Sequence, residues 1–99
     1  MAPVRENLTE LEGQVVRREP DPRRPGFETV VLEVSDAVAV EGMPDLVHAG
    51  PGEQVPVAVR SELLQDVAVG TRVRLRAART SSGDIMAEPH PTPEQFRIL

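Results

Sequence analysis

The stretch VGTRVRLRAARTSSGDIMAE, residues 69–88, predicts two strands joined by a turn. Successive side chains of a strand point to opposite faces, so apolar and basic residues that alternate here should separate. We expect one face to hold Val69, Thr71, Val73, Leu75 and Ala77, and the other to hold Arg72, Arg74 and Arg76. The turn TSSGD, residues 80–84, then leads to a strand with Ile85 and Ala87.

Other short apolar runs are separated by ten prolines and seven glycines, which is typical of an all-β domain. In the first run Gly13 marks a sharp bend, and Val55, Val57 and Val59 alternate in a later one. We expect strands at 11–18, 27–34, 37–40 and 53–59, a loop at 19–26, and a long loop ending at 50–52.

RSELLQDV, residues 60–67, predicts a helix of two turns with Ser61 as its N-cap. The tail is too rich in proline for regular structure before Phe96, Ile98 and Leu99, which we expect to form a last short strand. The chain is therefore predicted to be a single domain over residues 1–99, with a core at about 8–88 and a proline-rich tail at 89–99. The order of elements predicts an all-β, five-stranded Greek-key barrel, the OB-fold, with one short helix between strands 3 and 4.

Composition narrows the class of protein. The 99 residues carry a net charge of −5 and no cysteine, which argues against a wholly basic surface and excludes thiolate chemistry. All eleven basic residues are arginines, which suits phosphate or carboxylate binding, but a coding bias towards GC-rich codons is the favoured explanation. The start of the chain, residues 1–13, lacks the apolar core of a signal peptide. We expect a cytoplasmic protein without a membrane partner.

Three stretches resemble the single-stranded-DNA-binding group of OB-folds, and in particular the primosomal replication proteins. NLTELEGQVVRREP (7–20) is similar to the opening asparagine and L-x-G-x-V-x-R strand of that group, FETVVLEV (27–34) to its second strand, and VPVAV (55–59) with VAVGTRVRLRA (67–77) to later strands. Pro20 stands one residue late, and Ala77 replaces a glycine of the family. The resemblance implies an OB-fold that binds single-stranded nucleic acid by stacking bases on aromatic rings. Since this chain has two phenylalanines and no tryptophan or tyrosine, Phe27 is the candidate stacking residue.

The candidate nucleic-acid site is a set of arginines. Three on one strand are spaced about 6.5 to 7 Å apart, close to the phosphate repeat of an extended single strand. Four more lie in or near the first loop, where OB-folds bind ligands. The set is Arg17, Arg18, Arg23, Arg24, Arg72, Arg74 and Arg76. The alternative is an ordinary solvated strand whose arginines pair with acids across the sheet.

Two further interpretations remain open. Apolar residues on outward positions, Val16, Val31 and Phe27, favour a protein–protein adaptor or a homodimer. EGMPDLVHAGPGEQV, residues 41–55, is similar to a stretch of the haem chaperone of cytochrome c maturation, and suggests a small-ligand carrier. His48 and His90 lack the further ligands of a metal site, and no pair of carboxylates or activated serine suggests catalysis. We expect no enzyme activity, cofactor or metal.

Overall fold

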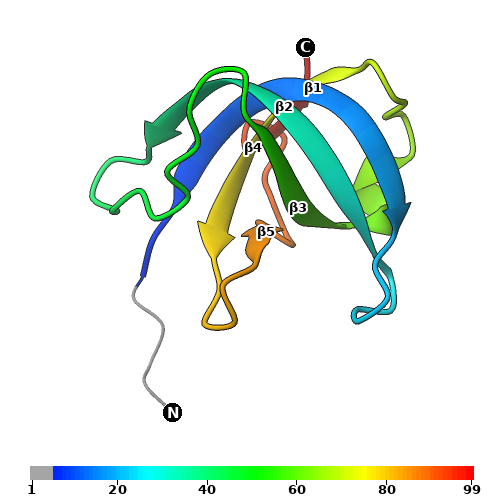
Figure 1. Cartoon of the computed structure of the whole chain (residues 1–99), viewed down its shortest axis with the longest axis horizontal. Helices are drawn as coiled ribbons and strands as arrows, with labels where there is room; N and C mark the ends of the chain where they lie inside the picture. Colours follow the sequence, from blue (N-terminus) through cyan, green and yellow to red (C-terminus); the bar gives the residue numbers. More distant parts are fainter. Residues whose placement is uncertain (1–5) are drawn as a thin grey trace.

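Strand β1 closes a five-stranded barrel in the computed structural model, which describes residues 6–99 (Figure 1). The elements are β1 (Thr9–Pro20), β2 (Phe27–Ala39), β3 (Gln54–Arg60), the 3-10 turn η1 (Ser61–Leu64), β4 (Arg72–Arg79), β5 (Ile85–Ala87) and β6 (Phe96–Ile98). The strand order is β1-β2-β3-β5-β4, and β4 pairs back to β1. Only the β3–β5 pairing is parallel. The predicted all-β barrel is confirmed, and it is compatible with an OB-like fold. Residues 1–5, included in the predicted domain and in the signal-peptide argument, lie outside the described residues.

The bend in β1 depends on Gly13. A Cβ atom at this position would lie 2.6 Å from the carbonyl oxygen of Glu33, closer than such atoms approach. The β1–β2 register also shifts beside Gly13 and again after Val15, so β1 coils around the barrel. Because β2 follows this curve without a break, the separate strand predicted at 37–40 is wrong, and its first three residues extend β2.

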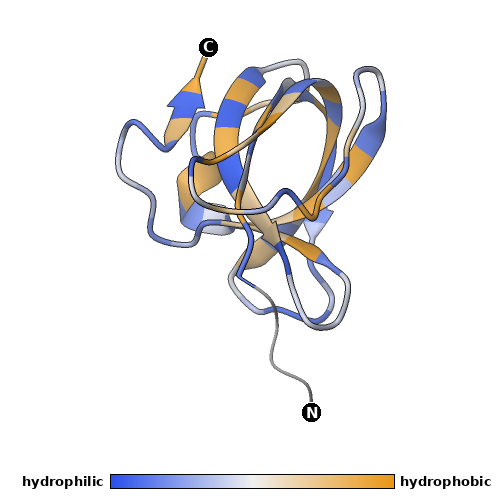
Figure 2. Cartoon of the chain, turned by 90° about the vertical axis from the view of Figure 1, so that its left-hand side faces the viewer, coloured by the Kyte–Doolittle hydropathy of each residue, from blue (hydrophilic) through white to orange (hydrophobic). Residues whose placement is uncertain are grey.

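The core lies inside the barrel and is built from the alternating apolar positions (Figure 2). The most buried side chains come from four different strands and include Leu11, Leu32, Val57, Val73 and Leu75. The predicted inward positions of β3 are confirmed. The prediction that Val69 lies on the apolar face of this strand is wrong, because Val69 is 63% exposed in the turn before β4 begins.

The short helix predicted between β3 and β4 is confirmed in its place, but its length of two turns over 60–67 and its cap at Ser61 are wrong. Only a single 3-10 turn forms, and no side chain caps its start. The guanidinium of Arg18 donates hydrogen bonds to the carbonyl oxygens of Leu64 (3.0 Å) and Val67. The carbonyl of Leu64 also accepts the N–H of Val67 (3.1 Å), so these carbonyls have partners without a further helical turn.

The tail ends in the predicted last strand. β6 pairs with the first half of β4, and Phe96 packs against the core. Ile98 in β6 and Leu99 after it remain about half exposed, so β6 covers the barrel with one face and leaves its other face in solvent. Over residues 6–99 we find no helix with the length and apolar character that crossing a bilayer requires.

Candidate binding groove beside strand β3

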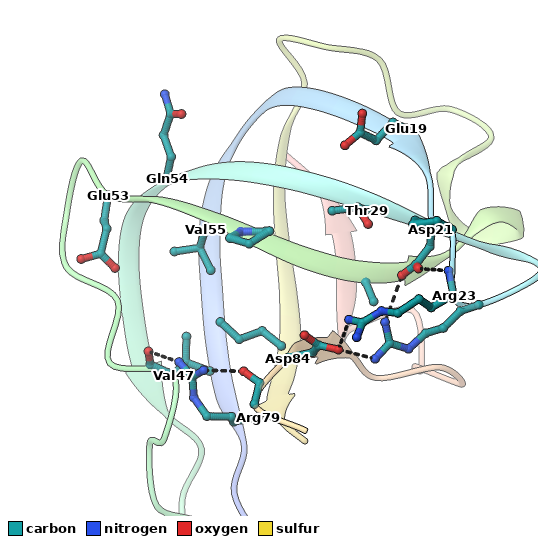
Figure 3. A pocket seen from close by; sticks show the side chains of 16 residues that line it. Glu19, Asp21, Arg23, Thr29, Val47, Glu53, Gln54, Val55, Arg79 and Asp84 are labelled. Atoms are coloured by element: carbon teal, nitrogen blue, oxygen red, sulfur yellow. Dashed lines mark hydrogen bonds and ion pairs between the residues drawn. The ribbon is translucent and has the colours of Figure 1, made fainter. Parts of the chain in front are cut away.

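An open groove of about 550 Å³ lies between β3 and the hairpin that joins β4 to β5 (Figure 3). Apolar side chains form its floor, and charged side chains from three loops and two strand ends form its rim. The floor consists of Val47, Val55, Pro56, Ala58 and Ile85, and the charged rim of Glu19, Asp21, Arg23, Arg24, Glu53, Arg79 and Asp84. The groove thus combines apolar surface with charges of both signs.

The groove exists because pairing on one side of β3 stops early. β3 pairs with β2 at seven positions, but with β5 at the single pair Ala58–Met86. Among the residues that the structure describes, Gln54–Val57 have no strand partner on the side away from β2. This half of β3 therefore forms an edge that faces the groove.

Backbone alternation identifies the groups that this edge presents. The carbonyl of Glu53 accepts from the N–H of Val34 (2.9 Å), and the N–H of Ser61 donates to Gly26 (2.9 Å). Odd-numbered residues of β3 thus direct their backbone groups to β2, and even-numbered residues direct theirs to the opposite edge. The N–H and C=O of Gln54 and the C=O of Pro56 therefore point toward the groove.

One end of the groove is closed by an ion-pair cluster between two loops. Asp84 Oδ2 accepts from Arg23 Nη2 at 2.5 Å and from Arg24 Nη2 at 2.8 Å. Arg24 Nη1 also donates to Asp21 Oδ2 at 3.0 Å. The hydrogen bond from Arg24 lowers the pKa of Asp84, and the backbone N–H of Arg23 lowers the pKa of Asp21. We call Asp21, Arg23, Arg24 and Asp84 the loop cluster.

Arg79 closes the other end of the groove. Its guanidinium donates to the carbonyls of Leu46 (2.7 Å), Gly83 (2.6 Å) and Val47 (3.2 Å). Within residues 6–99 no carboxylate forms an ion pair with this side chain. Arg79 and the loop cluster therefore tie the β4–β5 hairpin to the loops on both sides of it.

Asp45 shapes the loop that receives Arg79. Its Oδ1 accepts from the Thr9 hydroxyl (2.7 Å) and from the N–H groups of Val47 (2.9 Å) and His48 (3.1 Å). Burial raises the pKa of Asp45, but these hydrogen bonds outweigh it and the pKa lies below its ordinary value. The carboxylate thereby holds the carbonyl of Val47 where Arg79 can reach it.

The predicted arginines of β4 do not line this groove. Arg74 pairs with Glu12 at 2.7 Å, Arg72 with Glu12 at 3.2 Å, and Arg76 with Glu10 at 3.8 Å. Both glutamates lie on β1, directly across the sheet. The hydrogen bond to Glu12 raises the pKa of Arg74. The structure therefore shows the alternative predicted from the sequence, in which these arginines pair with acidic residues across the sheet.

The first-loop arginines are divided between the groove and the barrel wall. Arg23 and Arg24 line the groove, whereas Arg18 binds Glu28 through two hydrogen bonds of 2.7 Å. That contact raises the pKa of Arg18 and lowers the pKa of Glu28. Arg17 is exposed on β1, and Phe27 is half-buried opposite Arg60, outside the groove lining. The structure thus places two of the seven predicted arginines in the groove and three others together on the β1–β4 face.

The apolar residues that suggested a dimer are less accessible than expected. Val31 is 8% exposed, and Val16 and Phe27 are half-buried. The contribution of these residues to an interface stays a prediction.

Several groove residues had no signal in the sequence. Glu53, Gln54 and Pro56 belong to an apparently ordinary strand, and only the missing β5 partner makes them an edge. Asp84 is the exception, because it is the only acidic residue in the turn 80–84. A closed barrel brings that turn next to the first loop, so the sequence could have indicated a contact between Asp84 and the arginines of that loop.

No group of three or more metal-binding side chains occurs in the described part of the chain. Comparisons with protein-family models, curated proteins and solved structures gave no match.

Proposed function

We propose that this protein is a non-catalytic binding module that takes an extended polypeptide segment along the open edge of β3. The observation that carries the proposal is the pairing of β3, which ends at Ala58 while the strand continues to Gln54. A peptide that adds a strand to this edge would satisfy the free backbone groups of Gln54 and Pro56. The groove beside the edge provides the space for it.

The apolar floor supports a peptide ligand. Side chains of an added strand would alternate, one toward the groove and the next toward solvent. Pro56 is exposed in the groove lining and offers apolar contact surface for small or branched side chains, while the lining residues Val47 and Ile85 are nearly buried. Main-chain pairing would supply affinity and these contacts would supply selectivity.

The charges favour polypeptide over nucleic acid. Glu19 and Glu53 stand on the rim, and no basic residue of the described chain forms an ion pair with either. A phosphate backbone would be repelled by them, whereas a lysine or arginine of a peptide would be attracted. The groove also contains no aromatic side chain on which bases could stack.

The test uses random twelve-residue peptides selected on the immobilised full-length chain. Binding of a selected, labelled peptide is then compared between the native protein, Gln54→Pro and Gln54→Ala. Proline removes the N–H that faces the groove, whereas alanine keeps it, so alanine is the matched control. We expect Gln54→Pro to weaken binding by roughly tenfold, the loss of one backbone hydrogen bond, and Gln54→Ala to change it little. Equal affinities of both variants, or selected peptides that bind elsewhere, would contradict the proposal.

A further inference from the structure

We infer that Asp84 occupies a carboxylate-binding subsite formed by Arg23 and Arg24, and that a carboxylate of the bound polypeptide takes its place. This inference rests on the proposed function and adds the chemistry of one anchor residue. All three side chains line the groove, and Figure 3 shows Arg23 beside Asp84. The hairpin would then act as a built-in competitor for the ligand.

The contact made by Asp84 resembles a ligand contact rather than a local turn. Asp84 is 60 residues from Arg24 in the chain and comes from a different loop. One oxygen, Oδ2, accepts from Arg23 and Arg24, and it also lies 3.3 Å from the hydroxyl of Ser82. A guanidinium binds a carboxylate best through two parallel hydrogen bonds to two oxygens. An incoming carboxylate could therefore match the pair of guanidinium groups at least as well as Asp84 does.

The subsite has its own support when Asp84 leaves. Arg24 remains bound to Asp21, whose side chain is only 4% exposed and accepts the N–H of Arg23 at 2.9 Å. These contacts lie within residues 21–24 and do not involve the hairpin. Arg23, with a side chain 65% exposed, is accessible to a ligand. A binding site that persists without its occupant needs little reorganisation.

Charge balance favours a carboxylate over a phosphate. Without Asp84, the two arginines and Asp21 carry a net charge of +1, which one carboxylate neutralises. A phosphate dianion would exceed this charge and would also face Glu19 on the rim. The chemical class is therefore a monoanionic carboxylate, from an aspartate or glutamate side chain or from the carboxyl terminus of a peptide.

Displacement of Asp84 would release only one of the two ties on the hairpin. Arg79, at the end of β4, still donates to the carbonyls of Leu46 and Val47 in the β2–β3 loop, at the opposite end of the groove. The hairpin would thus stay attached while the end of the groove near Arg23 opens. This arrangement makes the loop cluster a contact that the ligand must break.

The experiment measures binding of N-acetyl-glutamate N-methylamide by NMR, following the side-chain N–H signals of Arg23 and Arg24. We expect Asp84→Asn to bind this probe roughly tenfold more tightly than the native protein. The matched glutamine probe, which lacks the charge, should bind neither protein. Adding Arg23→Gln to Asp84→Asn should abolish the gain, and the spectrum of each variant reports whether it is folded.

Three results would overturn the inference: no gain in Asp84→Asn, equal binding of the glutamine probe, or tighter binding of inorganic phosphate. An N-acetylated peptide with a free C-terminus and no acidic side chain is compared with an N-acetylated peptide amide whose one carboxylate is a glutamate side chain. This comparison distinguishes the two carboxylate sources, and binding of either supports the subsite. If the carboxylate probe does not bind, the proposed peptide binding at the β3 edge still stands, because the Gln54→Pro comparison does not depend on Asp84. If the Gln54→Pro comparison fails, the carboxylate probe still tests the subsite, because its binding does not involve β3.

Discussion

Arg24 and Asp84 are 60 residues apart in the chain, yet their side chains meet at 2.8 Å and join the β1–β2 loop to the β4–β5 hairpin. This contact closes one end of the groove beside β3. Since both side chains remain partly exposed, salt should weaken the contact. We predict that amide hydrogen exchange in residues 80–84 becomes faster in 1 M NaCl and in Asp84→Asn. Exchange that is unchanged in both would show that other contacts hold the hairpin.

Arg18 should be the most sensitive arginine for stability. It holds Glu28 and the carbonyls of Leu64 and Val67, and its removal leaves a partly buried carboxylate without this partner. We predict that Arg18→Met lowers the free energy of unfolding by about 2 kcal/mol. Circular dichroism in urea measures this, since the chain lacks tryptophan and tyrosine. The control is Arg17→Met on the same strand, which should change stability by less than about 0.5 kcal/mol.

Glu28 should contribute to the acid sensitivity of the fold. The contact with Arg18 lowers its pKa in the folded state below the ordinary value of 4.5. A depressed folded pKa gives stability that is present above the unfolded pKa and lost as pH falls through the folded value. We predict that unfolding free energy declines below pH 4.5 and that Glu28→Gln reduces this decline. A decline of the same size in the variant would assign the effect to other carboxylates.

Gly13 should tolerate no side chain. A Cβ atom there would lie 2.6 Å from the backbone oxygen of Glu33, which cannot move without separating β1 from β2. We predict that Gly13→Ala destabilises the protein by about 2 to 4 kcal/mol. Gly50→Ala is the control, because its Cβ would meet nothing within 4 Å. Equal melting temperatures for the two variants would refute the close approach.

The arginines of β4 should contribute little to binding single-stranded DNA. Glu10 and Glu12 pair with all three across the sheet, which leaves one net positive charge on this face. We predict that a labelled oligonucleotide binds weakly at low salt, and that Arg74→Gln leaves its affinity unchanged. Tight binding that weakens steeply with salt and falls in Arg74→Gln would restore the nucleic-acid hypothesis.

The barrel could be predicted because each strand has a buried face, and burial sorts alternating side chains strongly. Val73 and Leu75 show this directly, since both are 2% exposed and the arginines that alternate with them are not buried. Val69 escaped the pattern because the strand starts only at Arg72, and periodicity does not reveal where a strand begins. The helix was overestimated because the carbonyl of Leu64 finds a partner in Arg18, 46 residues away in the chain, which the local sequence does not reveal.

The groove could not be predicted from the same reasoning. It results from an absent pairing between β3 and β5, and alternation in either strand looks the same with or without a partner. The charged residues were visible in the sequence, but their partners come from other strands and loops, as Arg74 with Glu12 and Arg24 with Asp84 show. Local sequence therefore identified the arginines and left open whether their charges were free.

The most direct measurement is an isotope-edited NMR spectrum of the full-length chain with a selected peptide bound. We predict cross-strand contacts between peptide backbone protons and those of Gln54 and Pro56, together with slower exchange of the Gln54 N–H. Contacts confined to the β1–β4 face, or a bound peptide that leaves the Gln54 N–H exchanging as fast as in the free protein, would contradict strand addition at β3.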